Sequence, residues 1–285
     1  MAETGSAEES VEESAEGSTE GSTEKFRQRA AQSSYPAIRS LQGGLVVSCQ
    51  APSDSPLYEP SVIAAIAQAS VHQGAVGVRI DTPAHVEAVR RKVSVPIIGL
   101  WKQISQSEVP SEAPRLAASG FAASRFVAPN FGVYITPQFC HAEAIAAAGA
   151  DIIAIDATLR DRPAGETVES LITQIHQLGK PVMADVDTLE AAIAAAAAGA
   201  DLVGTTLYGY TYATRSLIPP GFDLLSALVQ HLSLPVLCEG GISSPSMARR
   251  AIELGADGVV VGTAITGIEA QVKAYRNQLA LELDS

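Results

Sequence analysis

The chain is poor in the residues that build disulfides, metal sites and membrane spans. Its 285 residues include three cysteines, one tryptophan and only 5% aromatic residues. Cys49, Cys140 and Cys238 are too few for a disulfide framework and lack zinc-ligand spacing. No apolar run approaches the ~20 residues of a membrane-spanning helix, and no basic stretch leads into an apolar one as in a signal peptide. We expect a cytoplasmic protein with no membrane association and no metal.

The chain has fewer basic than acidic residues, and most of this difference comes from one segment. The net charge is -12, yet the first 24 residues hold 8 of the 31 acidic side chains and none of the 19 basic ones. The other 261 residues hold 23 acidic and 19 basic side chains, a balance that argues against a nucleic-acid partner. Residues 1–35 carry too few bulky apolar groups to offset the entropy of ordering. We expect a disordered acidic tail there.

From Leu41 onward, short β-type runs alternate with helical stretches rich in Ala, Leu and Ile. Gly-Ala-Asp precedes three of these runs, and its glycine is expected to end a helix before the chain turns into a strand. The eight β-type runs are 45–50, 76–80, 96–101, 152–156, 182–186, 202–207, 236–239 and 258–262. Eight βα units in about 240 residues predict an α/β fold, a (β/α)8 TIM barrel over residues 36–285.

Two features qualify this prediction. An open doubly wound sheet is the alternative, but its Gly-rich dinucleotide fingerprint is absent, since Ser48-Cys49-Gln50-Ala51-Pro52 closes and follows the first run. Residues 103–133 break the βα rhythm with three prolines and little periodicity. A loop of this length is usually functional or disordered, so we read it either as a lid over the site or as an inert insertion.

Two charged residues end strongly apolar runs. Lys102 closes residues 95–102 and Glu239 closes residues 234–239. A strand buried on both faces has no water for a charge, so each charge is expected at a strand's carboxyl end, where a barrel carries its chemistry. A lysine and a carboxylate there form a candidate acid/base pair. Further polar residues at predicted strand ends are Gln50, Arg79, Asp156, Asp185, Thr205 and Thr206.

Glycines follow the last two predicted strands. Gly240 and Gly241 come after the seventh run, and Gly262 and Thr263 after the eighth. Backbone N–H groups at this place in a barrel are the usual phosphate site, and glycine lets the phosphate approach the backbone. The alternative is that these glycines serve tight turns only.

The histidines do not favour a metal site. All five lie in predicted helical stretches, without ligand spacing to a nearby carboxylate, and are expected at the surface. Asp156 is expected either to serve the site or to brace Arg160 or Arg162. No Ser/His/Asp arrangement or Walker loop is present.

Several strings resemble one known family, the N-acetylmannosamine-6-phosphate 2-epimerases. The similarity runs in order over about residues 41 to 268, with one insertion. The two most specific strings are Tyr134-Ile135-Thr136-Pro137 and Gly204-Thr205-Thr206-Leu207-Tyr208-Gly209-Tyr210-Thr211. The others include residues 48–51, 77–79, 97–102, 152–158, 162–163, 183–185, 238–242 and 260–266.

The resemblance implies a TIM barrel of the ribulose-phosphate-binding type and metal- and cofactor-independent epimerisation of an N-acyl amino-sugar 6-phosphate. It assigns catalysis to Lys102 and Glu239, and substrate binding or support to the set Gln50, Arg79, Asp185, Gly240, Gly241, Gly262 and Thr263. We also expect Thr205, at its predicted strand end, to bind substrate. It also implies a cytoplasmic enzyme of sialic acid breakdown, often a homodimer. Gly241 and Gly267 depart from the family, because many members carry a basic residue at each position.

A mechanism follows from these assignments. The C2 proton of the open-chain sugar is α to an aldehyde, so neutral Lys102 would remove it and protonated Glu239 would return one to the opposite face. Burial favours both uncharged forms, whereas a close Lys102–Glu239 ion pair would oppose them. Arg79 is expected to stabilise the enolate, and Asp185 to orient Lys102.

Two other functions stay open at this point. One is a Schiff-base aldolase using Lys102, and the other is a non-catalytic sugar-phosphate sensor, which the acidic tail and the missing basic residues favour. Residues 268–283 predict an amphipathic helix with Ile268, Val272, Tyr275 and Leu279 on one face, placed either to close the barrel or to pack on a second subunit.

Overall fold

The computed structural model describes residues 29, 32–104 and 132–281, and its centre is a closed barrel of eight parallel strands. The strands follow one another around the barrel in the order β1-β10-β9-β8-β7-β6-β3-β2. They are β1 (Gly44–Cys49), β2 (Gly77–Asp81), β3 (Ile97–Leu100), β6 (Ile152–Asp156), β7 (Val182–Asp185), β8 (Leu202–Gly204), β9 (Val236–Glu239) and β10 (Gly258–Val261). The barrel prediction is confirmed, and the doubly wound alternative is wrong.

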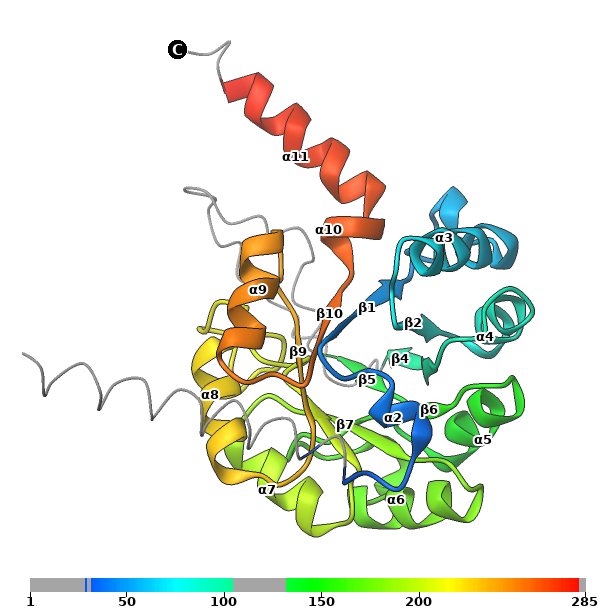
Figure 1. Cartoon of the computed structure of the whole chain (residues 1–285), viewed down its shortest axis with the longest axis vertical. Helices are drawn as coiled ribbons and strands as arrows, with labels where there is room; N and C mark the ends of the chain where they lie inside the picture. Colours follow the sequence, from blue (N-terminus) through cyan, green and yellow to red (C-terminus); the bar gives the residue numbers. More distant parts are fainter. Residues whose placement is uncertain (1–28, 30–31, 105–131, 282–285) are drawn as a thin grey trace, which may run out of the picture.

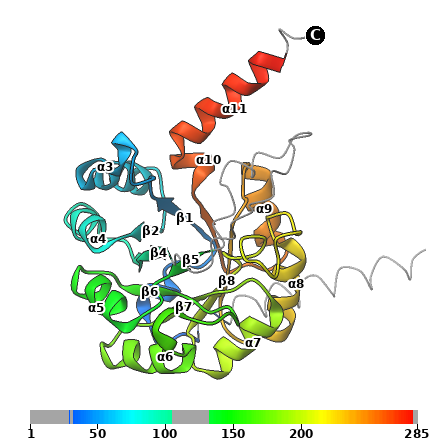
Figure 2. The same cartoon turned by 180° about the vertical axis from the view of Figure 1, so that it is seen from behind.

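Helices α3 to α9 surround the strands, whereas α11 extends away from the barrel (Figures 1 and 2). The helices are α2 (Pro36–Arg39), α3 (Pro60–His72), α4 (Pro83–Arg90), α5 (Phe139–Ala147), α6 (Val168–Gln177), α7 (Leu189–Ala197), α8 (Phe222–His231), α9 (Pro245–Glu253), α10 (Thr263–Thr266) and α11 (Ile268–Leu281), with 3-10 turns η1 (Pro56–Tyr58) and η4 (Pro163–Gly165). None of the helices in the described ranges is long and apolar enough to cross a membrane.

The region after β3 differs from the prediction. Lys102 does not end a barrel strand but begins β4 (Lys102–Ile104), which pairs antiparallel with β5 (Val133–Ile135). The barrel ladder stops at Leu100, because the chain leaves the parallel sheet there to enter this hairpin. Residues 105–131, most of the predicted insertion, lie outside the described residues.

The apolar core has two layers. Alternate strand residues, such as Val46, Ile152 and Leu237, fill the barrel interior, and Ile38 and Leu41 from the segment around α2 join this cluster. The intervening strand residues pack outward against the helices in a second, larger cluster. This alternation is the period-two consequence of strands buried on both faces.

The Gly-Ala-Asp repeat joins helix ends to strand starts. Its glycines take positive φ values of 105°, 101° and 95° just after the C-cap residues of α5, α7 and α9, which confirms their predicted helix-ending role. The carboxylate of each aspartate also accepts a hydrogen bond from the N–H of the first residue of an adjacent strand. The sequence did not reveal this role. The bonds are Ile97 to Asp151 at 2.9 Å, Val182 to Asp201 at 2.7 Å and Val236 to Asp257 at 2.8 Å.

Each of these carboxylates also contacts the side chain of an arginine or a histidine. Arg90 of α4 and His176 of α6 contact Asp151 and Asp201, but for Asp257 the cation comes from far away in the chain. Arg29 lies 3.2 Å from Asp257, is 8% exposed, and donates to the carbonyls of Val229 and Gly255. The predicted disordered tail, 1–35, therefore contains a packed residue, while residues 1–28 and 30–31 lie outside the described ones.

Replacing Arg29 by methionine should destabilise the fold by about 3 kcal/mol at pH 8, since it removes one partner of a buried pair. Burial raises the pKa of Asp257 to about 6, and Arg29 opposes this rise. The cost should therefore shrink below pH 6, where Asp257 is protonated and gains little from a cation. Thermal melts at pH 5 and 8 test this, with Arg91→Met in an exposed pair as the control. Equal losses at both pH values would contradict the ionic role.

Candidate active site

The carboxyl ends of the strands bring most of the predicted site residues to one mouth. Arg79 lies in β2, Asp185 ends β7 and Glu239 ends β9, while Gln50 follows β1 and Lys102 follows β3 by two residues. The side chains fall into two bonded groups. The first is Arg79, Asp185, Thr206 and Glu239, and the second is Ser48, Gln50 and Lys102.

Arg79 is the centre of the first group and is 1% exposed. Its Nη1 and Nη2 donate to the two oxygens of Asp185 at 3.0 and 2.6 Å, and Nη1 also donates to Glu239 Oε2 at 2.7 Å. A single guanidinium thus balances two carboxylates, the fully buried Asp185 and the largely buried Glu239, which is 12% exposed. Because Arg is planar and always charged, it suits such a two-sided contact better than lysine would.

Glu239 is held in a state that favours proton exchange near neutral pH. Burial, aided by the charge of Asp185, raises the pKa of Glu239 to about 7, although Arg79, the Thr206 hydroxyl and Lys102 all oppose the rise. Its backbone is fixed by Thr205, whose Oγ1 accepts the Glu239 N–H at 3.0 Å and donates to its carbonyl at 2.8 Å. The carboxyl can therefore both donate and accept a proton near pH 7.

Lys102 heads the second group. Its Nζ donates to Gln50 Oε1, and Gln50 Nε2 donates to Ser48 Oγ at 2.9 Å. Lys102 and Glu239 thus have different partners, Gln50 for one and Arg79 for the other, and the structure shows no ion pair between them. Lys102 is nevertheless exposed, so the burial that was expected to favour its uncharged form is not observed.

Two sequence assignments change in the structure. Asp185 was expected to orient Lys102, but its carboxylate accepts from Arg79 and from Thr206, at 2.5 Å. Thr205 was expected to bind substrate, yet it is fully buried and braces the Glu239 backbone. Thr206, the next residue, is the one whose hydroxyl meets the reactive carboxyl, at 3.2 Å.

The glycine loops lie beside this mouth. Within the described residues, the N–H groups of Gly240, Gly241, Gly262 and Thr263 donate to no other group of the chain. Gly240 and Gly241 have φ values of 96° and 71°, where an L side chain is strained. Four free donors at the ends of β9 and β10 fit an anionic ligand.

The two departures from the family pattern have a steric cause in this chain. A Cβ at Gly241 would lie 2.6 Å from Pro219 Cβ and 2.7 Å from the Pro219 carbonyl carbon. A Cβ at Gly267 would lie 2.8 Å from the carbonyl oxygen of Thr263. Neither position has room for a basic side chain in this backbone, so any phosphate contact there comes from the main chain.

The remaining polar candidates are structural. Asp156 is paired with Arg160 and accepts from the Thr158 hydroxyl at 2.7 Å, so the bracing alternative is the one observed. The surface prediction is wrong for His85, which is 3% exposed and packs edge-on against Tyr58. In the described part of the chain, no three His, Cys, Asp or Glu side chains are grouped as metal ligands.

Sequence reasoning missed Asp81 and Thr136. Asp81 Oδ1 accepts the Lys102 N–H at 3.0 Å, and Thr136 Oγ1 accepts the Trp101 N–H at 3.0 Å. The available signals were a charge directly after the second predicted strand, 76–80, and the family-specific string 134–137.

Comparison with known proteins identifies the family. The family described as "Putative N-acetylmannosamine-6-phosphate epimerase" matches residues 63–117 and 127–280. The chain belongs to this family. The unmatched segment between the two ranges, residues 118–126, lies inside the predicted insertion. It is shorter than that insertion, which was expected to span residues 103–133.

Relatives within this epimerase family cover nearly the whole barrel. A protein of Synechococcus elongatus named "Putative N-acetylmannosamine-6-phosphate 2-epimerase" is 58% identical over 241 residues, 84% of this chain and 94% of the relative. One of the same name from Thermosynechococcus vestitus is 56% identical over 245 residues, 86% of this chain and 96% of the relative.

Solved structures agree on the fold. The N-acetylmannosamine-6-phosphate 2-epimerase from Clostridium perfringens superposes with a TM-score of 0.73 at 33% identity, covering 84% of this chain and 94% of that one. A thiamine phosphate pyrophosphorylase from Pyrococcus furiosus gives a TM-score of 0.50 at 16% identity, covering 80% and 88%, a likeness of fold alone.

Proposed function

We propose that this chain interconverts N-acetylmannosamine 6-phosphate and N-acetylglucosamine 6-phosphate by inverting C2. The observation that carries the proposal is a carboxyl group with a pKa of about 7, Glu239, at the same mouth as a lysine that bonds elsewhere. The family membership and the names of the relatives support the substrate. A role in sialic acid breakdown and a cytoplasmic location belong to the same proposal.

Each proton transfer has a named donor and acceptor. In one direction neutral Lys102 takes the C2 proton and becomes an ammonium, the electron pair moves onto the C1 oxygen as an enolate, and protonated Glu239 returns a proton to the opposite face. The resulting Glu239 carboxylate is stabilised by Arg79 at 2.7 Å and by the Thr206 hydroxyl at 3.2 Å. The reverse direction exchanges the roles.

The substrate phosphate is assigned to the backbone N–H groups of Gly240, Gly241, Gly262 and Thr263. A dianion there would orient the sugar across the mouth toward Glu239, which directly precedes Gly240. Ser48 lies between the Lys102–Gln50 pair and the glycine loop after β10. Its Oγ accepts a hydrogen bond from Gln50, and its Cβ would be 3.4 Å from a Cβ added at Gly262.

Proton NMR of the purified protein with N-acetylmannosamine 6-phosphate tests the function. The C2 epimer should accumulate to equilibrium, and C2 should gain deuterium in D2O. Binding without turnover would reject the enzyme in favour of a sugar-phosphate sensor. Irreversible labelling of Lys102 by borohydride only in the presence of substrate would indicate a Schiff base instead.

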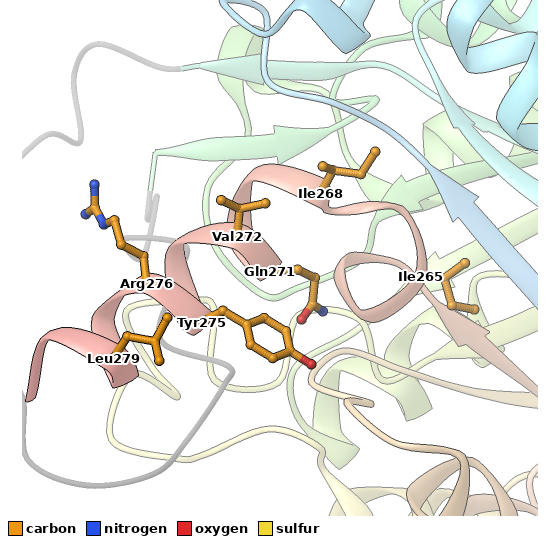
Figure 3. Close-up of a pocket in the computed structure, with 7 residues that line it drawn as sticks. All are labelled: Ile265, Ile268, Gln271, Val272, Tyr275, Arg276 and Leu279. Atoms are coloured by element: carbon orange, nitrogen blue, oxygen red, sulfur yellow. The ribbon is translucent and has the colours of Figure 1, made fainter. Parts of the chain in front are cut away.

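We extend the proposal to a homodimer formed through α11. Figure 3 shows Ile268, Val272, Tyr275 and Leu279 as side chains of this projecting helix, and they are 54%, 62%, 75% and 66% exposed. A groove of about 430 Å³ lies on the barrel's outer face between β1, β10 and α9, lined by Leu45, Val259 and Ile252 among others. The eighth helix of a TIM barrel covers this face.

Among the described residues, the chain therefore carries both an apolar groove and an apolar helix face that no other described element covers. A second copy of the chain would cover both surfaces, because α11 of each subunit can pack into the groove of the other around a two-fold axis. Val272→Asp combined with Tyr275→Asp should convert the dimer to a monomer in sedimentation equilibrium, since two charges would enter an apolar contact. Asn277→Asp, which adds one charge to the same helix at an exposed polar position, should stay dimeric. A monomeric unmodified protein would contradict the exchange.

A further inference from the structure

The backbone that carries Lys102 is held by two side chains rather than by the barrel. β3 ends at Leu100, and β4 begins at Lys102 in a different sheet, so the N–H groups of Trp101 and Lys102 fall between the two ladders. Thr136 Oγ1 accepts the first and Asp81 Oδ1 accepts the second, each at 3.0 Å.

Thr136 is bonded to Trp101 in both directions. Besides accepting the Trp101 N–H, it donates its own N–H to the Trp101 carbonyl at 2.9 Å. Thr136 is fully buried, and no other hydrogen-bonding side chain among the described residues reaches the Trp101 N–H. The segment that precedes Lys102 is thereby fixed relative to the end of β5.

Thr136 also has an unfavourable backbone conformation, with φ at 45°. For a β-branched residue this is a genuine outlier, because Cβ crowds the neighbouring carbonyl. Glycine or asparagine would adopt it more easily but would not present a hydroxyl at the same place. Such outliers concentrate where a structure constrains a functional group.

We propose that Thr136 and Asp81 are positioning residues that set the Lys102 side chain over C2 of the substrate. The inference rests on the proposed function. Asp81 ends β2, and Thr136 directly follows β5. Two separate elements therefore fix the position of the Lys102 backbone. A shift of either element would move Nζ relative to Gln50 and to the reacting carbon, and proton transfer depends steeply on that placement.

Paired variants separate positioning from folding. Thr136→Val and Asp81→Val remove the acceptor at similar volume, whereas Thr136→Ser and Asp81→Asn keep an oxygen in its place. The valine variants should lose about 10- to 100-fold in kcat with KM within about twofold. The serine and asparagine variants should retain most of the wild-type kcat. Ile172→Val, a truncation in the buried face of α6, serves as the control for general destabilisation.

A second readout is independent of turnover. Trp101 is the only tryptophan of the chain, so its fluorescence and the exchange rate of its amide report on this segment directly. In Thr136→Val the emission should shift and amide exchange should accelerate, while both stay unchanged in Ile172→Val. Wild-type kcat in the valine variants, or a raised KM at unchanged kcat, would overturn the positioning role.

The failure of the underlying function is distinguishable. Absence of epimerisation by the unmodified protein would overturn the proposed function and this inference with it. Normal epimerisation by the unmodified protein together with an undisturbed Thr136→Val variant would overturn the inference alone.

Discussion

Lys102→Ala and Glu239→Gln are each expected to slow epimerisation by about 10²- to 10⁴-fold, the range typical of a general acid or base. The two variants should differ in isotope exchange. With Lys102 intact, Glu239→Gln should still exchange the C2 proton of one epimer with D2O, because deprotonation needs only one base. Lys102→Ala should retain exchange only for the opposite epimer. NMR in D2O starting from each pure epimer measures both rates.

A single lysine that serves both faces would give a different pattern. Glu239→Gln would then epimerise at a rate close to its exchange rate, which would contradict the two-residue assignment. The pH profile offers a further check. Because the pKa of Glu239 is raised to about 7, the direction in which it donates should lose rate as pH rises above about 7.

Arg79→Met should destabilise the fold by about 3–5 kcal/mol at pH 8, since it leaves Asp185 and Glu239 buried without their cation. Arg79 is also the largest influence that opposes the raised pKa of Glu239, so this pKa should rise further in the variant. When a carboxyl has a higher pKa in the folded than in the unfolded protein, the free energy of unfolding falls as the pH rises from the unfolded toward the folded pKa. The cost should therefore be smaller at pH 5, where Glu239 is protonated and needs no cation.

Urea unfolding at pH 5 and 8 measures these losses, with Arg249→Met in an exposed ion pair as the control expected to change little. Adding Asp185→Asn to Arg79→Met should restore part of the stability, because one unpaired charge is removed and the two sites are coupled. A loss below about 1 kcal/mol at pH 8 for Arg79→Met would contradict the central ionic role of Arg79.

The barrel could be predicted because its signals are local. Each β-type run is short and apolar, and glycines at 149, 199 and 255 end the preceding helices at positive φ. The end of β3 could not be predicted in the same way. The apolar run 95–101 continues past Leu100, and only pairing with β5, more than 30 residues later, moves Lys102 into a hairpin.

The candidate site was predicted as a set of residues but not as a network. A charge after an apolar run is visible in sequence, and it located Lys102 and Glu239. The partner of each charge was not visible. Asp185 could have met Lys102 or Arg79, and only the closed barrel, which brings Asp185 of β7 to Arg79 of β2, shows which of the two it contacts.

By itself, the sequence determined the eight βα units, the family and the two residues proposed to move the proton. These depend on composition, spacing and motif, which need no contacts between distant segments. The tertiary structure alone decided that Arg79 balances two carboxylates, that burial raises the pKa of Glu239 to about 7, and that Asp81 and Thr136 hold the backbone at Lys102. Barrel closure brings strand ends from separate parts of the chain within a few ångströms of one another, and both desolvation and hydrogen bonding arise only at that distance.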